Sequence, residues 1–203
     1  MKKILEENFN MSLTGKEFKW IFEVEKDGLY AIEIVAACKN WRQNFSVQDD
    51  DLAIKINNTS FPHKKNSKKL FDNEAAWNGN NLKGLKKIGV FVLPLKAGKR
   101  TLTFLIHKQP FLESVRVFQI EEKEFSYLPQ DNHPQDGNRR QWLTIAFRNV
   151  GVNDISVSAT AQTGEHYSNH TSDDSDLKIV IDNIIQKNTE KKSHKNWYWC
   201  GRT

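Results

Sequence analysis

Cysteine is scarce in this chain, with Cys38 and Cys200 the two among 203 residues. Two cysteines do not make a disulfide framework or a zinc site with four cysteine ligands. Cys38 ends an apolar run, which is typical of a small buried hydrophobic residue. The sequence therefore excludes a disulfide-rich scaffold.

Long apolar runs are also missing. No stretch reaches the roughly 18 apolar residues that a membrane-spanning helix needs, so no membrane span is expected. The first eight residues begin with two lysines, but Glu6 and Glu7 interrupt any apolar core, so we do not expect a signal peptide. Cytoplasmic location is the default expectation, and an extracellular one would require another export route.

Catalytic motifs are absent as well. The chain has no glycine-rich phosphate loop, no His-Glu-x-x-His helix and no nucleophile elbow. Its six histidines are dispersed, and no spacing of acidic residues singles out a pair for glycoside hydrolysis. We therefore expect no catalytic residue and no enzyme activity here. A catalytic domain, if the protein has one, would lie beyond residue 203.

Short strand-like segments dominate what is present. Residues 18–25 and 29–37 are rich in β-branched and aromatic residues, and Asp27-Gly28 between them is a strong hairpin signal. No segment shows a helical period over 11 or more residues. The hydrophobic content of 38% is enough for a packed core. The sequence predicts an all-β fold, a jelly-roll-like β-sandwich.

One segment occurs twice. Residues 50–58 return, slightly altered, as residues 174–183, and matching Leu52 with Leu177 gives a period of 125 residues (177 − 52). The strand at Trp20 has a counterpart in residues 142–147. The three closing strands of the first unit have no counterpart before Thr203. We therefore expect a second, truncated copy of the sandwich.

The repeat sets the predicted domain organisation. It comprises an N-terminal extension (1–14), a first sandwich module (15–122), a linker (123–140) and an incomplete second module (141–203). A half sandwich leaves unpaired strand edges and an uncovered apolar face. The second module is therefore expected either to pack against the first or to be poorly stable alone.

Acidic clusters precede the repeated strand in both copies. Calcium takes six to eight oxygen ligands, often from aspartates, but each cluster offers at most three carboxylates and neither fits an EF-hand loop. Calcium is the one cofactor considered, and a solvated turn before a strand is the favoured alternative. The candidate metal ligands are Asp49, Asp50, Asp51, Asp173, Asp174 and Asp176.

Aromatic residues in polar, loop-like contexts are the best functional lead, because an exposed ring can stack on the apolar face of a sugar while amides bind its hydroxyls. Trp20 and Trp142, by contrast, look like core residues. In the alternative interpretation, Trp77 and Trp197 fold back as lids over the sandwich ends. The predicted ligand-binding residues are Trp41, Trp77, Asn78, Asn80, Asn81, Trp197, Tyr198, Trp199, Lys64 and Lys65.

The net charge of +5 comes mainly from lysine-rich loops. A solvated surface explains it, and attraction to an anionic polymer is the sharper alternative. Lysines interleaved with aromatic rings could stack on nucleic-acid bases. Nucleic acid is the less favoured partner, because the charge is moderate and no nucleic-acid-binding motif is present. The oligomeric state is left open.

Several segments together resemble a β-sandwich of the carbohydrate-binding-module type: Trp20 to Val24, Asp27-Gly28-Leu29-Tyr30, and Gly98-Lys99-Arg100-Thr101-Leu102. The resemblance covers residues 15–122 and, in truncated form, 140–200. It implies a non-catalytic module that binds a glycan or cell-wall polymer, similar to the N-terminal modules of bacterial cell-wall hydrolases. The alternatives are a structural or protein-interaction sandwich that presents a neighbouring domain, and a binder of nucleic acid or another anionic polymer.

Overall fold

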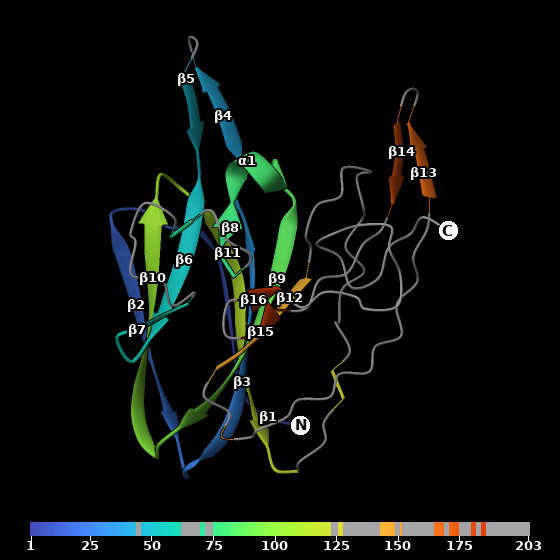
Figure 1. The fold of residues 1–203 in the computed structure, drawn as a ribbon. Coiled ribbons are helices and arrows are strands. Elements are labelled where there is room, and N and C mark those ends of the chain that lie inside the picture. The colour runs from blue at the N-terminus through green and yellow to red at the C-terminus, as the bar shows by residue number, and fades with distance from the viewer. Residues whose placement is uncertain are drawn as a thin grey trace.

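The computed structural model describes residues 1–43, 46–61, 70–71, 75–122, 126–127, 143–148, 151, 165–168, 171–174, 180–181 and 184–185. Two sheets face each other in these residues (Figure 1), and their one helix, α1 (Gly79–Leu82), is a single turn. The predicted all-β sandwich is confirmed. No helix in the described part of the chain is long and apolar enough to cross a membrane.

Two sheets with different strand orders build the sandwich. Sheet A has the order β1-β11-β3-β9-β12-β15-β16, and sheet B has the order β2-β10-β6-β7, with β8 also paired to β6. The strands up to residue 120 are β1 (Lys2–Ser12), β2 (Glu17–Val24), β3 (Gly28–Ala37), β4 (Asn40–Gln43), β5 (Ser46–Asp49), β6 (Asp51–Ile56), β7 (Thr59–Phe61), β8 (Trp77–Asn78), β9 (Lys86–Leu95), β10 (Gly98–His107) and β11 (Phe111–Ile120). The later strands are β12 (Leu143–Phe147), β13 (Glu165–Ser168), β14 (Thr171–Asp174), β15 (Val180–Ile181) and β16 (Ile184–Ile185).

Alternating side chains place the main core between the sheets. In β10, Leu102, Phe104 and Ile106 are buried in this core, as the two-residue period of a strand requires. Residues 2–12, which the sequence suggested as an extension before the sandwich, form the edge strand β1 of sheet A. Phe9 and neighbouring apolar residues of β1 pack against the main core, which explains why this segment joins the sheet.

A second apolar cluster covers the opposite, outer face of sheet A. It comprises six buried residues from β3, β9 and β11, with Leu143, Ile145 and Phe147 of β12 and Tyr127 packed against it. Strands buried on both faces have near-continuous apolar runs, as residues 88–93 do and as residues 29–37 do except at Glu33. The six buried residues are Ala31, Val35, Ile88, Val90, Val92 and Ile120.

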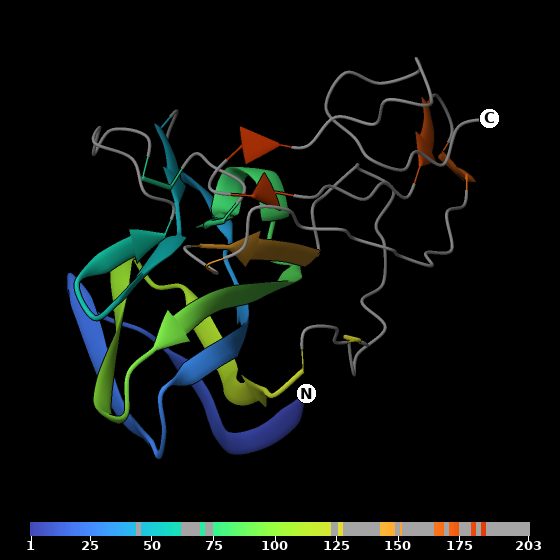
Figure 2. The ribbon, with the colours of Figure 1, turned by 60° about the horizontal axis from the view of Figure 1, so that its bottom comes forward.

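Strand β12 makes its contacts with the first sandwich. It pairs in parallel with β9, from Leu143 opposite Ile88 to Phe147 opposite Val92, and Figure 2 shows the two strands side by side. Ala146 is buried in the main core. The Arg148 guanidinium reaches across to sheet B and donates to the Ser60 carbonyl at 2.7 Å. The start of the predicted second module therefore packs against the first, one of the two expected outcomes.

The strand pairing of the later region repeats that of the first. The β13–β14 hairpin pairs Glu165 with Asp174, and the β4–β5 hairpin pairs Asn40 with Asp49. Both partners are displaced by 125 residues (165 − 40 and 174 − 49), which is the period found in the sequence. The β15–β16 pair repeats the register of β6 and β7 at the same displacement. The predicted domain boundaries themselves stay a prediction.

Candidate ligand-binding site

The candidate site lies at the end of the sandwich where the β4–β5 hairpin projects, with α1 at its base (top of Figure 1). Asn78 caps α1, because its side-chain oxygen accepts the Asn81 N–H at 3.0 Å. Asparagine is a preferred residue at this position. Lys83 ends the helix with φ of 52°, and its N–H donates to the Gly79 carbonyl at 2.8 Å. The Asn-rich sequence therefore folds into one capped turn.

Gly79 allows α1 to approach the neighbouring backbone closely. A Cβ atom at this position would lie 2.2 Å from the Lys39 carbonyl oxygen and 2.6 Å from that of Asp50. The Gly79 N–H donates to the Asp50 carbonyl at 2.9 Å. Only glycine fits such a backbone approach. The Asn-Gly pair at 78–79 is thus required to seat the helix.

Three polar side chains meet at the surface beside α1. The Asn80 side-chain oxygen accepts from the Asn40 amide at 3.1 Å and from the Lys83 ammonium at 3.0 Å. Asn80, Asn81 and Lys83 are exposed, and Asn40 is half-buried at the start of β4. We call the surface formed by Asn40, Asn80, Asn81 and Lys83 the amide ledge. Amides offer both donors and acceptors, and the ammonium adds a charged donor.

Trp77 is completely buried, which corrects its prediction as an exposed aromatic platform. Its indole N–H donates to the Lys87 carbonyl at 2.8 Å, and its ring centroid lies 6.0 Å from that of Phe91. Gly89 leaves the space that the indole ring fills. The residue closes the end of the core, as the lid alternative expected.

The other predicted ligand-binding residues are distributed unevenly. Asn80 and Asn81 lie in the amide ledge, whereas Asn78 is buried and its side chain caps α1. Trp41 follows Asn40 in β4, so its backbone runs beside the ledge. The remaining predicted residues, Lys64, Lys65, Trp197, Tyr198 and Trp199, lie outside the described residues.

The first acidic cluster is engaged by the protein itself. The Asp50 carboxylate accepts the Lys39 N–H at 3.3 Å and the Gln109 N–H at 3.1 Å. The Asp51 carboxylate accepts the Gly79 N–H at 3.3 Å and lies 3.2 Å from His107 Nδ1. Burial raises the pKa of Asp51.

Metal binding by these clusters stays a prediction. Within the described residues, no group of three or more histidine, cysteine or acidic side chains is arranged to hold a metal ion. Asp49 lies at the end of β5 beside the engaged pair, and Asp173 and Asp174 belong to β14. Asp176 lies outside the described residues.

Sequence reasoning missed the pairing of Asp51 with His107. The Phe71 ring stacks on the half-exposed His107 ring, with centroids 6.2 Å apart. The three residues are far apart in the sequence, and only the adjacency of β6 and β10 brings two of them together. Asn40 was missed for the same reason, because it lies 40 residues before Asn80. Lys83 lies three residues after Asn80, so its spacing in the sequence could have identified it.

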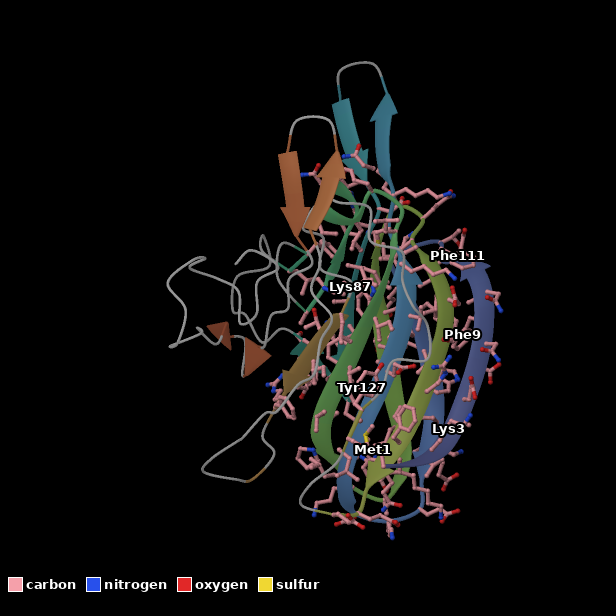
Figure 3. The ribbon with its side chains drawn as sticks, turned by 90° about the vertical axis from the view of Figure 1, so that its right-hand side faces the viewer. Met1, Lys3, Phe9, Lys87, Phe111 and Tyr127 are labelled. Carbon is pink, nitrogen blue, oxygen red and sulfur yellow. The ribbon has the colours of Figure 1, made fainter. Side chains whose placement is uncertain are left out.

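A second polar cluster lies on the outer face of sheet A. The buried Glu33 carboxylate accepts from Arg116 Nη1 at 2.7 Å and from the Tyr127 hydroxyl, which Figure 3 shows over the sheet. Arg116 Nε also donates to Glu6 at 2.9 Å. Each charge in this cluster has a partner, so we assign it an anchoring role: it fixes the segment after β11 to the sheet.

Comparisons with known proteins give only a weak fold resemblance. No protein-family model matches the sequence, and no curated protein matches it significantly. Among solved structures, a family 35 carbohydrate-binding module from Clostridium thermocellum has 14% sequence identity and a TM-score of 0.33, covering 57% of this chain and 92% of that one.

Two further solved structures match part of a much longer chain. Dimeric latent PorU from Porphyromonas gingivalis has 9% identity and a TM-score of 0.37, covering 58% of this chain and 13% of that one. A family GH115 4-O-methyl-α-glucuronidase has 12% identity and a TM-score of 0.33, covering 54% of this chain and 14% of that one. The likeness to these three structures is weak and concerns the fold alone.

Proposed function

We propose that this chain is a non-catalytic module that binds a polysaccharide or cell-wall polymer at the amide ledge and the adjoining β4–β5 hairpin. The observation that carries the proposal is the exposed hydrogen-bonded group of Asn40, Asn80 and Lys83, directly beside the strand that contains Trp41. Amides and an ammonium group suit the hydroxyl groups of a sugar, because they offer hydrogen-bond donors and acceptors.

The ledge is held in place before any ligand arrives. Two donors fix the Asn80 amide, the capped turn fixes its backbone, and Gly79 seats that turn on the ends of β4 and β6. Polar groups that are already ordered lose less conformational entropy on binding. We therefore expect the ledge to bind its ligand without a large rearrangement.

Retention on insoluble polysaccharides and on isolated bacterial cell walls tests this proposal. We expect Asn80→Ala and Trp41→Ala each to weaken retention about fivefold, because one well-placed polar contact or stacked ring contributes on the order of 1 kcal/mol. Asn8→Ala on β1 is the matched control, since Asn8 is an exposed asparagine on a strand that does not contact the ledge. No retention of the parent chain on any polymer, or unchanged retention of both variants, contradicts the proposal.

A second candidate function is presentation of a neighbouring domain, and the pairing of β12 with β9 favours it. The outer face of sheet A is buried against Tyr127 and the apolar residues of β12, so this face serves packing between parts of the chain. A module that only spaces other domains would not be retained on any of the polymers. Substitutions in the amide ledge would leave the stability of such a module unchanged.

A further inference from the structure

We propose that Asp50 and Asp51 are positioning residues that set the geometry of the amide ledge, acting together with Gly79 as a latch on α1. This inference deepens the proposed function, and its ligand-binding part rests on that function. The two carboxylates were predicted as metal ligands. Their contacts give them a different role, which is to hold three segments together at one end of the sandwich.

The two neighbouring carboxylates hold different segments. Asp50 accepts the N–H of Lys39, just before β4, and the N–H of Gln109, just after β10. Asp51 accepts the N–H of Gly79, the first residue of α1, at 3.3 Å, and shares this donor with the Asp50 carbonyl at 2.9 Å. Both carboxylates are nearly inaccessible, with the two residues 1% and 8% exposed. Hydrogen bonds from N–H groups to a carboxylate are stronger than neutral ones, and more so away from water.

Backbone hydrogen bonds connect the residues of the latch directly to the amide ledge. Lys39 and Asp50 are joined by an Asp50 N–H bond to the Lys39 carbonyl at 2.8 Å, and the Gly79 N–H reaches the Asp50 carbonyl at 2.9 Å. Asn40 follows Lys39 and Asn80 follows Gly79. The two side chains that meet at 3.1 Å in the ledge therefore each follow a residue that the latch holds. A shift of Gly79 would separate them.

The two aspartates differ in whether asparagine can take their place. Both Asp50 oxygens accept N–H groups, so the NH2 group of Asp50→Asn would face a donor. Asp51 has one oxygen on the Gly79 N–H and the other on His107 Nδ1, which can accept when it is unprotonated. Asp51→Asn can therefore keep both contacts. The latch predicts that asparagine rescues position 51 and fails at position 50.

Hydrogen exchange of backbone amides, followed by NMR, tests the latch without any ligand. We expect Asp51→Ala and Asp50→Asn to lower the protection of the Gly79 and Lys83 amides at least tenfold relative to amides in the β2–β10 pair. Asp51→Asn should retain it. Asp27→Ala is the matched control, because Asp27 also accepts a backbone N–H, from Ala97 at 2.8 Å, in a turn away from the ledge. Protection lost equally across all amides, or unchanged at Gly79, would overturn the latch.

Retention of the same variants on the polymer tests the link to binding. We expect Asp51→Ala and Asp50→Asn to weaken retention about tenfold and Asp51→Asn to match the parent. If the parent chain binds no polymer, the proposed function fails, and the exchange experiment still decides whether the latch exists. If the Gly79 amide loses protection while retention is unchanged, the positioning role is wrong and the latch is structural only.

Discussion

The two sheets of the sandwich differ in how many of their faces are buried. Sheet B packs one face into the main core, and its outer face bears residues such as Lys19, Lys55 and Ile21, the last of which is 62% exposed. Sheet A is buried on both faces, and Val90 on its outer face is 1% exposed. The outer face of sheet A is therefore used for packing, whereas the outer face of sheet B faces solvent.

The largest expected effect is the loss of everything after residue 122. This change would remove β12 and Tyr127 and expose the six buried residues of the outer cluster. Burying one large apolar side chain contributes about 1.5–3 kcal/mol, so the loss approaches the roughly 5–15 kcal/mol of a whole domain. We expect an aggregating chain that binds a hydrophobic dye.

Size-exclusion chromatography, dye fluorescence and circular dichroism would check this expectation. A chain that ends after residue 185 retains every strand of the described structure and serves as the control. A shortened chain that stays monomeric, binds no dye and unfolds cooperatively would show that residues 1–122 fold independently, as the predicted module boundary implies.

A charge placed on each outer face sharpens the comparison between the sheets. Val90→Asp buries a carboxylate beside Glu33, the residue opposite it on β3, and should cost more than about 5 kcal/mol. Ile21→Asp replaces an exposed side chain on sheet B and should cost about 1 kcal/mol. Urea denaturation of both variants measures the difference. Equal losses would mean that the two outer faces are buried alike.

The sequence predicts much of this asymmetry for the strands themselves. The alternation in residues 18–24 and the Asp27-Gly28 turn predict a hairpin, and β2, β3 and the intervening turn confirm it. The near-continuous apolar runs in β3 and β9 are also typical of strands buried on both faces. The outer face continues onto β12, which pairs with β9 from about 50 residues further along the chain, and no local pattern encodes that pairing.

The candidate site was predicted only in part. Asn80 and Asn81 were found because amides in a polar loop are typical of ligand contacts. Trp77 was misassigned because polar neighbours in the sequence suggested exposure, whereas its burial depends on Gly89 and Phe91 of another strand. Side-chain burial is set by such tertiary contacts, which the local composition does not contain.

The buried ion pair of sheet A provides the next test. Arg116→Met removes the partner of the buried Glu33 carboxylate and should cost about 3–5 kcal/mol, because an uncompensated buried charge remains. Tyr127→Phe removes one hydrogen bond to Glu33 and should cost about 1 kcal/mol.

Adding Glu33→Gln to Arg116→Met should recover part of the loss, because it neutralises the stranded charge. Thermal unfolding of the parent chain, Arg116→Met, Tyr127→Phe and the double variant checks this order of stability. A double variant less stable than Arg116→Met alone would contradict an electrostatic origin. Sheet B provides the comparison: its outer ion pair, Lys19 with Glu17, is exposed, so Lys19→Met should change stability by less than about 1 kcal/mol.

The smallest expected effect is a pH dependence with opposite sign at the two ends of the sandwich. Burial raises the pKa of Asp51, so its stabilising contribution is present at low pH and is lost as pH rises through the folded-state pKa. The Lys96 ammonium, and then the Ala97 N–H, lower the pKa of Asp27, so its contribution is present above the unfolded-state pKa and is lost as pH falls. Relative to the parent chain, Asp51→Asn should therefore gain stability as pH rises from about 4 through the folded-state pKa of Asp51. Asp27→Asn should lose stability relative to the parent as pH rises toward about 4 from the folded-state pKa of Asp27. Urea midpoints measured below and above about pH 4 follow both trends. Two trends of the same sign would mean that burial does not govern the pKa of Asp51.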